Sequence, residues 1–301
     1  MMFSLNTFPT IQERFERFGS VAPNSTTDIT DKHELPDLQN SQQDFFIPIQ
    51  AVGVKNVMFP INITSSIDPN IQTTTATFTM TTDLQQNQKG INMSRLTESL
   101  QTYFQEKDLS FLSLKGFTTQ LAEKMEQKAS NVKVTYPWFY NKKAPVTGLE
   151  GTAHASVEQE VHYTNDDHYT YTFSLTGSVA SLCPCSKEIS TYGAHNQRSH
   201  IELQVDIYET AIDLDWKSIL LNIIENNAST VLYPVLKRPD EKKVTEQAYE
   251  NPRFVEDLVR LVALEVYENE FVQAFTVTCT NEESIHQHDA IATITYSKDP
   301  R

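Results

Sequence analysis

Residues 168–182 read HYTYTFSLTGSVASL, and their pattern fixes the class of structure that this chain adopts. Aromatic and aliphatic side chains occupy every second position from Tyr169 to Leu175, and a period of two places them on one face of an extended strand. A second alternating run, IELQVDIYE at 201–209, follows. The sequence therefore predicts two strands of an antiparallel sheet in this region.

Two helices are expected after this strand pair. The run from Trp216 to Glu225 follows Asp215, whose side chain can cap a helix. The next helix is better marked, because Asn251 can cap it and Pro252 suits its first turn. Its apolar stripe consists of Phe254, Val255, Leu258, Val259, Val262 and Val266.

Two closing strands, expected at 271–279 and 290–296, give the second half the order strand, strand, helix, helix, strand, strand. The first half repeats this order. Its strands are expected at 45–63, 73–82, 132–136 and 152–162, and its helices at 94–104 and 110–128. Two antiparallel four-stranded sheets in tandem, each with a helix pair on one face, define an α+β fold. Their open edges favour edge-to-edge assembly into a closed barrel, so we expect an oligomer.

The chain divides into three predicted segments. Residues 1–43 are polar and form an arm, with one short helix expected at 11–18. Residues 44–165 form the first unit, and residues 166–301 form the second unit, which carries most of the chemically reactive motifs.

The chain of 301 residues carries 24 Lys and Arg against 39 Asp and Glu, a formal net charge of −15 at pH 7. A surface this acidic repels a phosphate backbone, so we exclude a non-specific nucleic-acid binder and expect any nucleotide to bind in a local pocket. No run approaches the roughly 18 apolar residues that span a bilayer, so no membrane partner is expected. The start of the chain lacks a basic leader with an apolar core, and the 3 cysteines are an odd number, which together favour a reducing cytoplasm.

The densest chemistry lies in SLCPCSKEISTYGAHNQRSH, residues 181–200. Its reactive side chains are Cys183, Cys185, Lys187, Glu188, His195, Arg198 and His200. A cysteine and a histidine at this separation can meet on one borderline-soft cation if the segment turns back, and Gly193 offers a place to turn. This set is incomplete, so a further ligand must come from elsewhere. The alternative is a loop thiol and a surface histidine.

A second cluster, KRPDEKKVTEQAYENPRFVED, occupies residues 237–257. Such a charged run is usually a solvated loop. Glu256 stands out because it falls in the first turn of the predicted helix, where the helix dipole favours a carboxylate. A carboxylate there could accept two hydrogen bonds from a guanine-like edge, although an ordinary helix-start residue is the alternative.

The third cluster is NEESIHQHDA, residues 281–290, between the last two strands. Histidine beside a carboxylate is suited to moving protons, which makes Glu283 and His286 candidates for acid/base chemistry. His286 and His288 could instead bind a metal, or the segment could be a polar hairpin. Cys279 lies in an apolar alternating strand and is expected to be a buried small hydrophobic residue.

These motifs together are similar to those of a known enzyme family. CPCSKEIS (183–190), YGAHNQRSH (192–200), LKRPDEKKVTEQAYENP (236–252) and ESIHQHDA (283–290) resemble the prokaryotic GTP cyclohydrolases of type IB. The resemblance extends from about residue 35 to the end of the chain. It implies the tunnelling fold, a homotetramer with active sites at subunit interfaces, and hydrolysis of GTP to 7,8-dihydroneopterin triphosphate and formate, which opens folate (tetrahydrofolate) biosynthesis.

The resemblance also implies roles for single residues. It places a divalent metal ion, with zinc, manganese and iron as candidates, on Cys183, His195 and Glu241. It makes Glu256 the anchor of the guanine edge. Glu283 and His286 would be acid/base candidates, and Cys185 would lie beside the metal as an additional ligand or a proton-handling group. Four basic residues are candidate triphosphate partners on charge alone. They are Lys187, Arg198, Lys237 and Arg238.

The sequence leaves two other functional hypotheses open. An NADPH-dependent nitrile reductase of the same fold would use a cysteine nucleophile and no metal, but its Glu-Ser-Lys-Ser type of cofactor motif is not found in this sequence. A non-catalytic metal or redox module would bind zinc and release no formate from GTP.

Overall fold

The computed structural model describes residues 10–18, 39, 41–105 and 107–298. The strands are β1 (Ile49–Thr64), β2 (Ile71–Leu84), β3 (Ala129–Lys143), β4 (Glu150–Thr164), β5 (His168–Leu182), β6 (Asn196–Ile207), β7 (Thr230–Val231), β8 (Val272–Glu282) and β9 (Ala290–Ser297). The helices are α1 (Ile11–Phe18), α2 (Ser94–Tyr103), α3 (Phe111–Lys124), α4 (Pro184–Ile189), α5 (Trp216–Asn226), α6 (Arg238–Glu250) and α7 (Val255–Glu268).

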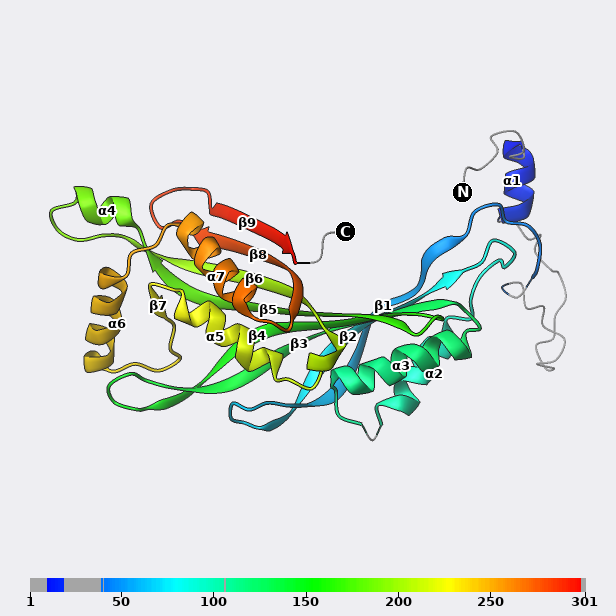
Figure 1. Ribbon diagram of the computed structural model, residues 1–301, viewed down its shortest axis with the longest axis horizontal. Helices are drawn as coiled ribbons and strands as arrows, with labels where there is room; N and C mark the ends of the chain where they lie inside the picture. The colour runs from blue at the N-terminus through cyan, green and yellow to red at the C-terminus, as the bar shows by residue number, and fades with distance from the viewer. Residues whose placement is uncertain (1–9, 19–38, 40, 106, 299–301) are drawn as a thin grey trace, which may run out of the picture.

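All strands belong to one antiparallel sheet of order β1-β2-β3-β4-β5-β6-β8-β9, with β7 paired to β5 (Figure 1). The expectation of two separate four-stranded sheets is therefore wrong. A short turn joins β4 to β5, so these strands pair directly from Thr164 opposite His168 to Ser156 opposite Thr176. The two predicted units share this long sheet, and their element order is as expected except for the additional α4, α6 and β7.

One face of the sheet is covered by helices, and the residues of each strand that point to this face are the apolar ones. Tyr171, Phe173 and Leu175 of β5 are buried on that face, as their period predicted. Helices α2 and α3 cover the first half, and α5 and α7 cover the second. The ring of Phe111, at the start of α3, packs at 5.8 Å from Tyr171 and 6.1 Å from Phe173. Because a first-half helix contacts a second-half strand, the two halves share one hydrophobic core.

The segment between α5 and α7 differs from expectation. The charged run is not a loop, because it folds as α6 and ends with Asn251 as its C-cap, whose N–H donates to the Gln247 carbonyl. Asn251 therefore does not cap α7, and Pro252 lies between the two helices. The Asp257 carboxylate accepts a hydrogen bond from Phe254 N–H at 3.1 Å instead, at the start of α7.

Two further boundaries also differ. The helix expected at 110–128 ends at Lys124 because Glu126 adopts a left-handed conformation, with φ 55°, before β3 begins. Asp215 does precede α5, but its carboxylate binds Ser66 of the β1–β2 turn rather than the helix backbone.

The predicted short helix of the arm is present as α1. Phe18 packs on Phe45 with ring centroids 5.9 Å apart, and Arg17 lies over the ring of Phe46. Residues 1–9, 19–38 and 40 of the predicted arm lie outside the described residues. Within the part of the chain that the structure describes, no helix has the length and apolar character that a membrane crossing requires.

Candidate functional site

Cys183 and His195 lie opposite each other where the β5–β6 hairpin opens into a loop. The ladder of paired residues ends at Leu182 opposite Asn196, and Cys183 N–H then donates to the His195 carbonyl at 3.2 Å. Alternation puts Cys183 and His195 on the same face as Ser181, which is buried on the helix-covered side. The predicted sulfur and imidazole ligands are therefore neighbours at one end of the sheet.

The loop between these two residues is closed by its own backbone. Cys183 is the N-cap of α4, and its sulfur accepts a hydrogen bond from Ser186 N–H at 3.5 Å. The Ser186 hydroxyl donates to the Cys183 carbonyl and accepts from His195 N–H at 3.2 Å. Gly193 has φ 141°, so the chain turns back where the sequence predicted.

A serine that sequence reasoning missed orients His195. Nδ1 of His195 lies 3.1 Å from the Ser284 hydroxyl, which belongs to the β8–β9 turn. Among the described residues Nε2 of the same ring has no hydrogen-bond partner. A histidine held at one nitrogen presents the other for a metal or a proton. The first and third sequence clusters therefore meet at this imidazole.

Glu283 is held by a second pair of polar residues that the sequence did not single out. With its amide oriented to satisfy both neighbours, Gln197 donates to Glu283 Oε1 at 3.0 Å and accepts from Asn281 Nδ2 at 2.8 Å. Gln197 and Asn281 are buried. The alternation of the strands was the available signal, because Gln197 and Asn281 occupy inward positions in line with the apolar residues Ile201 to Ile207 of β6 and Phe275 to Cys279 of β8.

The two histidines of the β8–β9 turn lie beside each other. The rings of His286 and His288 are stacked, with centroids 5.1 Å apart and an interplanar angle of 15°. Both side chains are exposed, and they follow Glu283 in the same turn. They can exchange protons with solvent or with a ligand at this end of the molecule.

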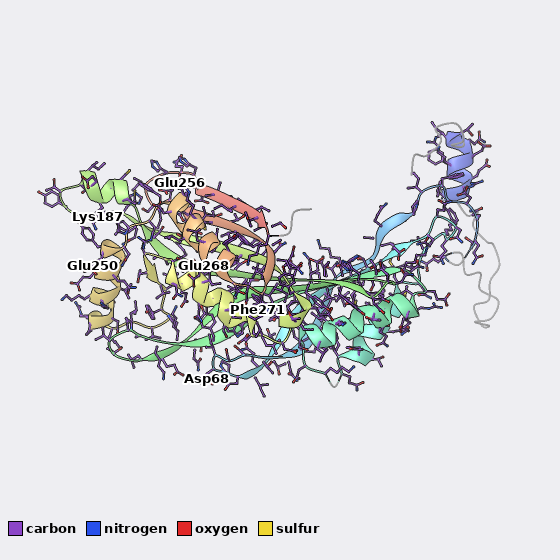
Figure 2. The ribbon with its side chains drawn as sticks, in the orientation of Figure 1. Asp68, Lys187, Glu250, Glu256, Glu268 and Phe271 are labelled. Carbon is purple, nitrogen blue, oxygen red and sulfur yellow. The ribbon has the colours of Figure 1, made fainter. Side chains whose placement is uncertain are left out.

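Glu256 reaches the same end through the segment before α7. Arg253 N–H donates to the Leu182 carbonyl at 3.0 Å, one residue from Cys183. Glu256 follows in the first turn of α7, as predicted, and its side chain is exposed. Figure 2 shows Glu256 and Lys187 at this end of the molecule.

Three predicted residues either contact another element or lie on the other face of the sheet. Lys187 donates to the Tyr249 carbonyl at 2.5 Å, and its ammonium lies over the Tyr249 ring. Its positive charge therefore stabilises the C-terminal end of α6. Arg198 and His200 lie on the open face of the sheet, opposite the helices, because β6 alternates. His200 binds Glu282 and Ser178, each at 2.9 Å.

Glu241 lies apart from the thiol and the imidazole. It occupies the first turn of α6 and is exposed, eight residues before Tyr249 and so about 12 Å away along the helix axis. The neighbouring Asp240 is buried and fixes this end of α6 by accepting hydrogen bonds from Val146 and Thr147. Across the described ranges, no group of three or more His, Cys, Asp or Glu side chains is arranged to hold a metal ion.

The three cysteines differ in environment. Cys185 is exposed in α4, while Cys279 is buried in β8, where burial raises its thiol pKa to about 12. Cys279 is thus a buried small hydrophobic residue, as expected, and is chemically inert. All three are free thiols.

Comparison with known proteins places these motifs in a wider context. A family model described as type I GTP cyclohydrolase folE2 matches residues 35–292. The chain is 53% identical over 293 residues to the GTP cyclohydrolase FolE2 of Halalkalibacterium halodurans, covering 97% of this chain and 98% of that protein. It is 50% identical over 293 residues to the protein of the same name in Bacillus subtilis, covering 97% and 96%.

A solved structure supports the fold. The chain superposes on the uricase from Arthrobacter globiformis with a TM-score of 0.52 and 7% sequence identity, covering 84% of this chain and 95% of that one. At this identity the likeness concerns the fold alone, and it confirms the predicted tunnelling fold.

Proposed function

Because the chain belongs to the type I GTP cyclohydrolase FolE2 family, we propose that it hydrolyses GTP to 7,8-dihydroneopterin triphosphate and formate, the first step of folate biosynthesis. One observation carries the proposal. The thiol of Cys183, the imidazole of His195 and the turn that holds Glu283 meet at one end of the sheet. The segment leading to Glu256 joins the same end.

We propose that Cys183 and His195 are two ligands of a divalent cation and that Glu241 is a third. A sulfur and an imidazole nitrogen suit zinc, and a carboxylate in the set also admits manganese or iron. The Ser284 contact at Nδ1 of His195 is the kind of outer hydrogen bond that metal-binding histidines make. A cation there would supply Lewis acidity and lower the pKa of a water molecule.

The position of Glu241 bears on how the set is completed. Its separation from Tyr249 along α6 means that the isolated chain does not bring it to Cys183. We propose that metal binding and subunit assembly together bring a Glu241 carboxylate to the site. This supports the expectation of active sites at subunit interfaces.

The remaining residues of this end are assigned to substrate and protons. Glu256 accepts hydrogen bonds from the guanine edge, whose N–H and amino groups are donors. Glu283, oriented by Gln197, and the exposed His286 and Cys185 act as acid/base groups during ring opening. In this assignment His286, one of the two imidazoles of the turn whose Ser284 contacts His195, protonates the departing nitrogen.

The triphosphate contacts rest on charge. Lys187 donates one of its three N–H groups to the Tyr249 carbonyl, which leaves the others for a phosphate. Arg198 lies on the open face of the sheet, where it would meet a triphosphate only from that side. Lys237 and Arg238 are exposed at the start of α6 and are the alternative partners.

We propose a homotetramer in the cytoplasm. The sheet of one chain has two open edges, β1 and β9, and open edges favour pairing with another copy. Beside β9 lies an apolar groove of about 440 Å³, which exposes Leu264, Tyr267 and Tyr296. The free thiols fit a reducing compartment.

The test is turnover of GTP by chelator-stripped protein, incubated without oxygen and with or without zinc or manganese. Metal-dependent release of formate together with a fluorescent oxidised pterin is the expected result. Formate without pterin would mean ring opening to a different product. Absence of both, with consumption of NADPH in a parallel reaction that contains it, would favour the nitrile reductase. Tight zinc binding without turnover would favour the non-catalytic module.

A further inference from the structure

A second cavity, of about 280 Å³, lies where the two halves of the sheet meet, on the helix-covered face. Strands β3, β4 and β5 contribute to it, together with the β1–β2 turn and the starts of α3 and α5. The polar side chains along it include those of Ser66, Ser110, Tyr136, Gln159, Asp215 and Lys217. Among the described residues that line it, none belongs to the proposed GTP site.

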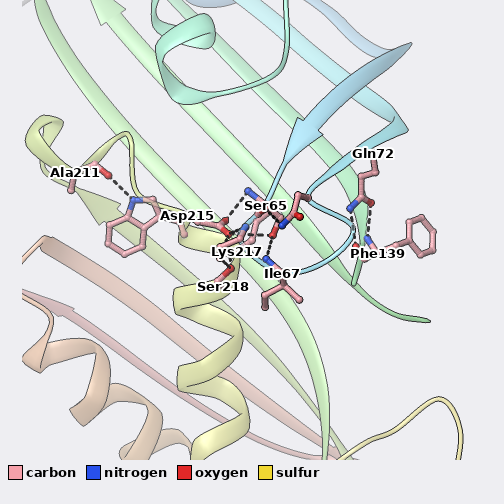
Figure 3. Close-up of polar contacts among 11 residues, drawn as sticks. Ser65, Ile67, Gln72, Phe139, Ala211, Asp215, Lys217 and Ser218 are labelled. Atoms are coloured by element: carbon pink, nitrogen blue, oxygen red, sulfur yellow. Dashed lines mark hydrogen bonds and ion pairs between the residues drawn. The ribbon is translucent and has the colours of Figure 1, made fainter. Parts of the chain in front are cut away.

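An ion pair lies at the α5 side of this cavity. Lys217 Nζ is 2.9 Å from Asp215 Oδ1, and Oδ2 of the same carboxylate accepts hydrogen bonds from Ser66 and Ser218 (Figure 3). Burial alone would raise the pKa of Asp215, but the Lys217 charge and these hydrogen bonds hold it well below its usual range. Oδ2 of Asp215 is thus satisfied by the protein, while Oδ1 has the Lys217 ion pair and no hydrogen bond from another described residue.

Lys217 and Gln159 have capacity to spare. Lys217 is 8% exposed, and among the described residues its ammonium, which has three N–H groups, makes only the ion pair with Asp215. Gln159 is 6% exposed, and its buried Oε1 has no hydrogen-bond partner in the described part of the chain. Turning the amide over puts its N–H groups in the place of Oε1, where they have no partner among the described residues and are available to an acceptor. Buried polar groups left in this state favour a bound partner.

The surroundings favour an anion with an apolar body. The N-termini of α3 and α5, helices of 14 and 11 residues, both line the cavity and add positive potential. Phe111, Phe173 and Trp216 supply aromatic walls. Asp215 balances the charge of Lys217, and Asp213 adds a negative charge at the rim, so a highly charged anion such as a triphosphate is disfavoured.

We propose that this cavity binds a small organic monocarboxylate, with its carboxylate on Lys217 and Gln159 and its apolar part against Phe111, Phe173 and Trp216. The volume suits a molecule about the size of a single aromatic ring with one carboxylate. The carboxylate accepts hydrogen bonds from the unpaired N–H groups of Lys217 and Gln159. The binding is independent of GTP turnover at the other site.

The experiment is calorimetric titration of the full chain with benzoate, and with benzamide as its neutral isostere. We expect saturable binding of benzoate that is about 10- to 100-fold tighter than that of benzamide, because hydrogen bonds to charged groups contribute about 1.5–3 kcal/mol. Lys217→Met and Gln159→Leu should each weaken benzoate binding at least about tenfold. Lys115→Met, which removes an ammonium that pairs with Glu209 and does not line the cavity, is the matched control and should bind benzoate as the parent does.

Lys217→Met leaves Asp215 without its cation and can lower the yield of folded protein. Gln159→Leu keeps the ion pair and tests the site separately. The proposal is overturned if benzoate shows no saturable binding, if benzamide binds equally well, or if Gln159→Leu retains the parent's affinity for benzoate.

Discussion

The hydrogen bond between Ser284 and His195 joins residues that are 89 positions apart in the sequence. It fixes the imidazole ring of His195, a proposed metal ligand, through Nδ1 and leaves Nε2 for a metal ion. Contacts of this kind typically contribute 10- to 100-fold to metal affinity, an order-of-magnitude expectation of about 1–3 kcal/mol.

Ser284→Ala should therefore weaken metal binding by about 10- to 100-fold, while Ser284→Thr, which keeps the hydroxyl, should restore most of it. The measurement is a competition titration with a chromogenic chelator. Ser190→Ala, in the same exposed loop as α4, is the control. Equal metal affinity in Ser284→Ala and Ser190→Ala would remove Ser284 from the site.

Glu256→Gln replaces one acceptor oxygen with an amide donor at the predicted guanine contact. We expect kcat/KM for GTP to fall about 10- to 100-fold, the value of charge-assisted hydrogen bonds, with no change in secondary structure. Glu268→Gln, at the opposite end of the same helix, should leave turnover unchanged. Steady-state kinetics on both variants decide the matter, and parent-like kcat/KM in Glu256→Gln contradicts the assignment.

At this scale the sequence predicted some contacts and could not predict others. Local spacing and turn chemistry indicated that Cys183 and His195 could meet on a cation; the structure places their backbones side by side, and the shared cation remains a prediction. The partners Ser284 and Gln197 depend on the register between β6 and β8, which is set by pairing of distant strands. Arg198 was grouped with Cys183 by proximity in sequence, but strand alternation places it on the other face.

Among the elements, α5 is tied to the β1–β2 turn by one carboxylate. Asp215 accepts hydrogen bonds from Ser65 and Ser66 of the turn. Burial would raise its pKa, but the Lys217 charge and the hydrogen bonds from Ser218 and Ser66 hold it well below its usual range. A carboxyl group whose pKa is lower in the folded state than in the unfolded state stabilises the fold at pH values above its unfolded-state pKa of about 3.9. This contribution is lost as the pH falls below about 3.9 and toward the folded-state pKa.

Asp215→Asn should therefore be less stable than the parent at pH 7, and the difference should shrink as the pH falls below about 4. Urea unfolding of metal-free protein across this range measures it. Asp213→Asn, an exposed neighbour, should match the parent at every pH. A stability difference for Asp215→Asn that stays constant down to pH 2 contradicts the linkage.

Periodicity found most elements but not α6. Apolar alternation located β5 and β6, and an apolar stripe located α7. The run 238–250 buries only Asp240 and Ala248, so it carries no such stripe and resembles a loop in composition. What holds it is tertiary: the buried Asp240 carboxylate binds the β3–β4 turn, and Lys187 binds its other end. Contacts of that kind are not visible in local sequence.

For the whole molecule, the unexpected feature is the continuous sheet. The repeat of element order predicted the two halves, but it did not show that β4 and β5 would pair. Three residues connect Thr164 to His168, which is short enough for a hairpin, so this pairing was available from connection length. The long sheet leaves its two open edges far apart in sequence, at β1 and β9.

Assembly can be tested at the groove beside β9. Leu264 is 59% exposed there, and Leu264→Glu should break the proposed homotetramer into smaller species because it places a charge in an apolar groove. Turnover should fall with the loss of assembly. Leu112→Glu, at a leucine of α3 that is 63% exposed, is the control. Light scattering after size exclusion gives the mass, and an intact tetramer in Leu264→Glu would exclude this groove from the interface.

The central claim is that Cys183 and His195 form the nucleus of a metal site that GTP turnover requires. Its most direct test is the metal content and formate release of Cys183→Ala beside Cys279→Ala, which removes a buried thiol elsewhere. Cys183→Ala should lose bound metal and turnover together, while Cys279→Ala should keep both. Full metal occupancy in folded Cys183→Ala would contradict it.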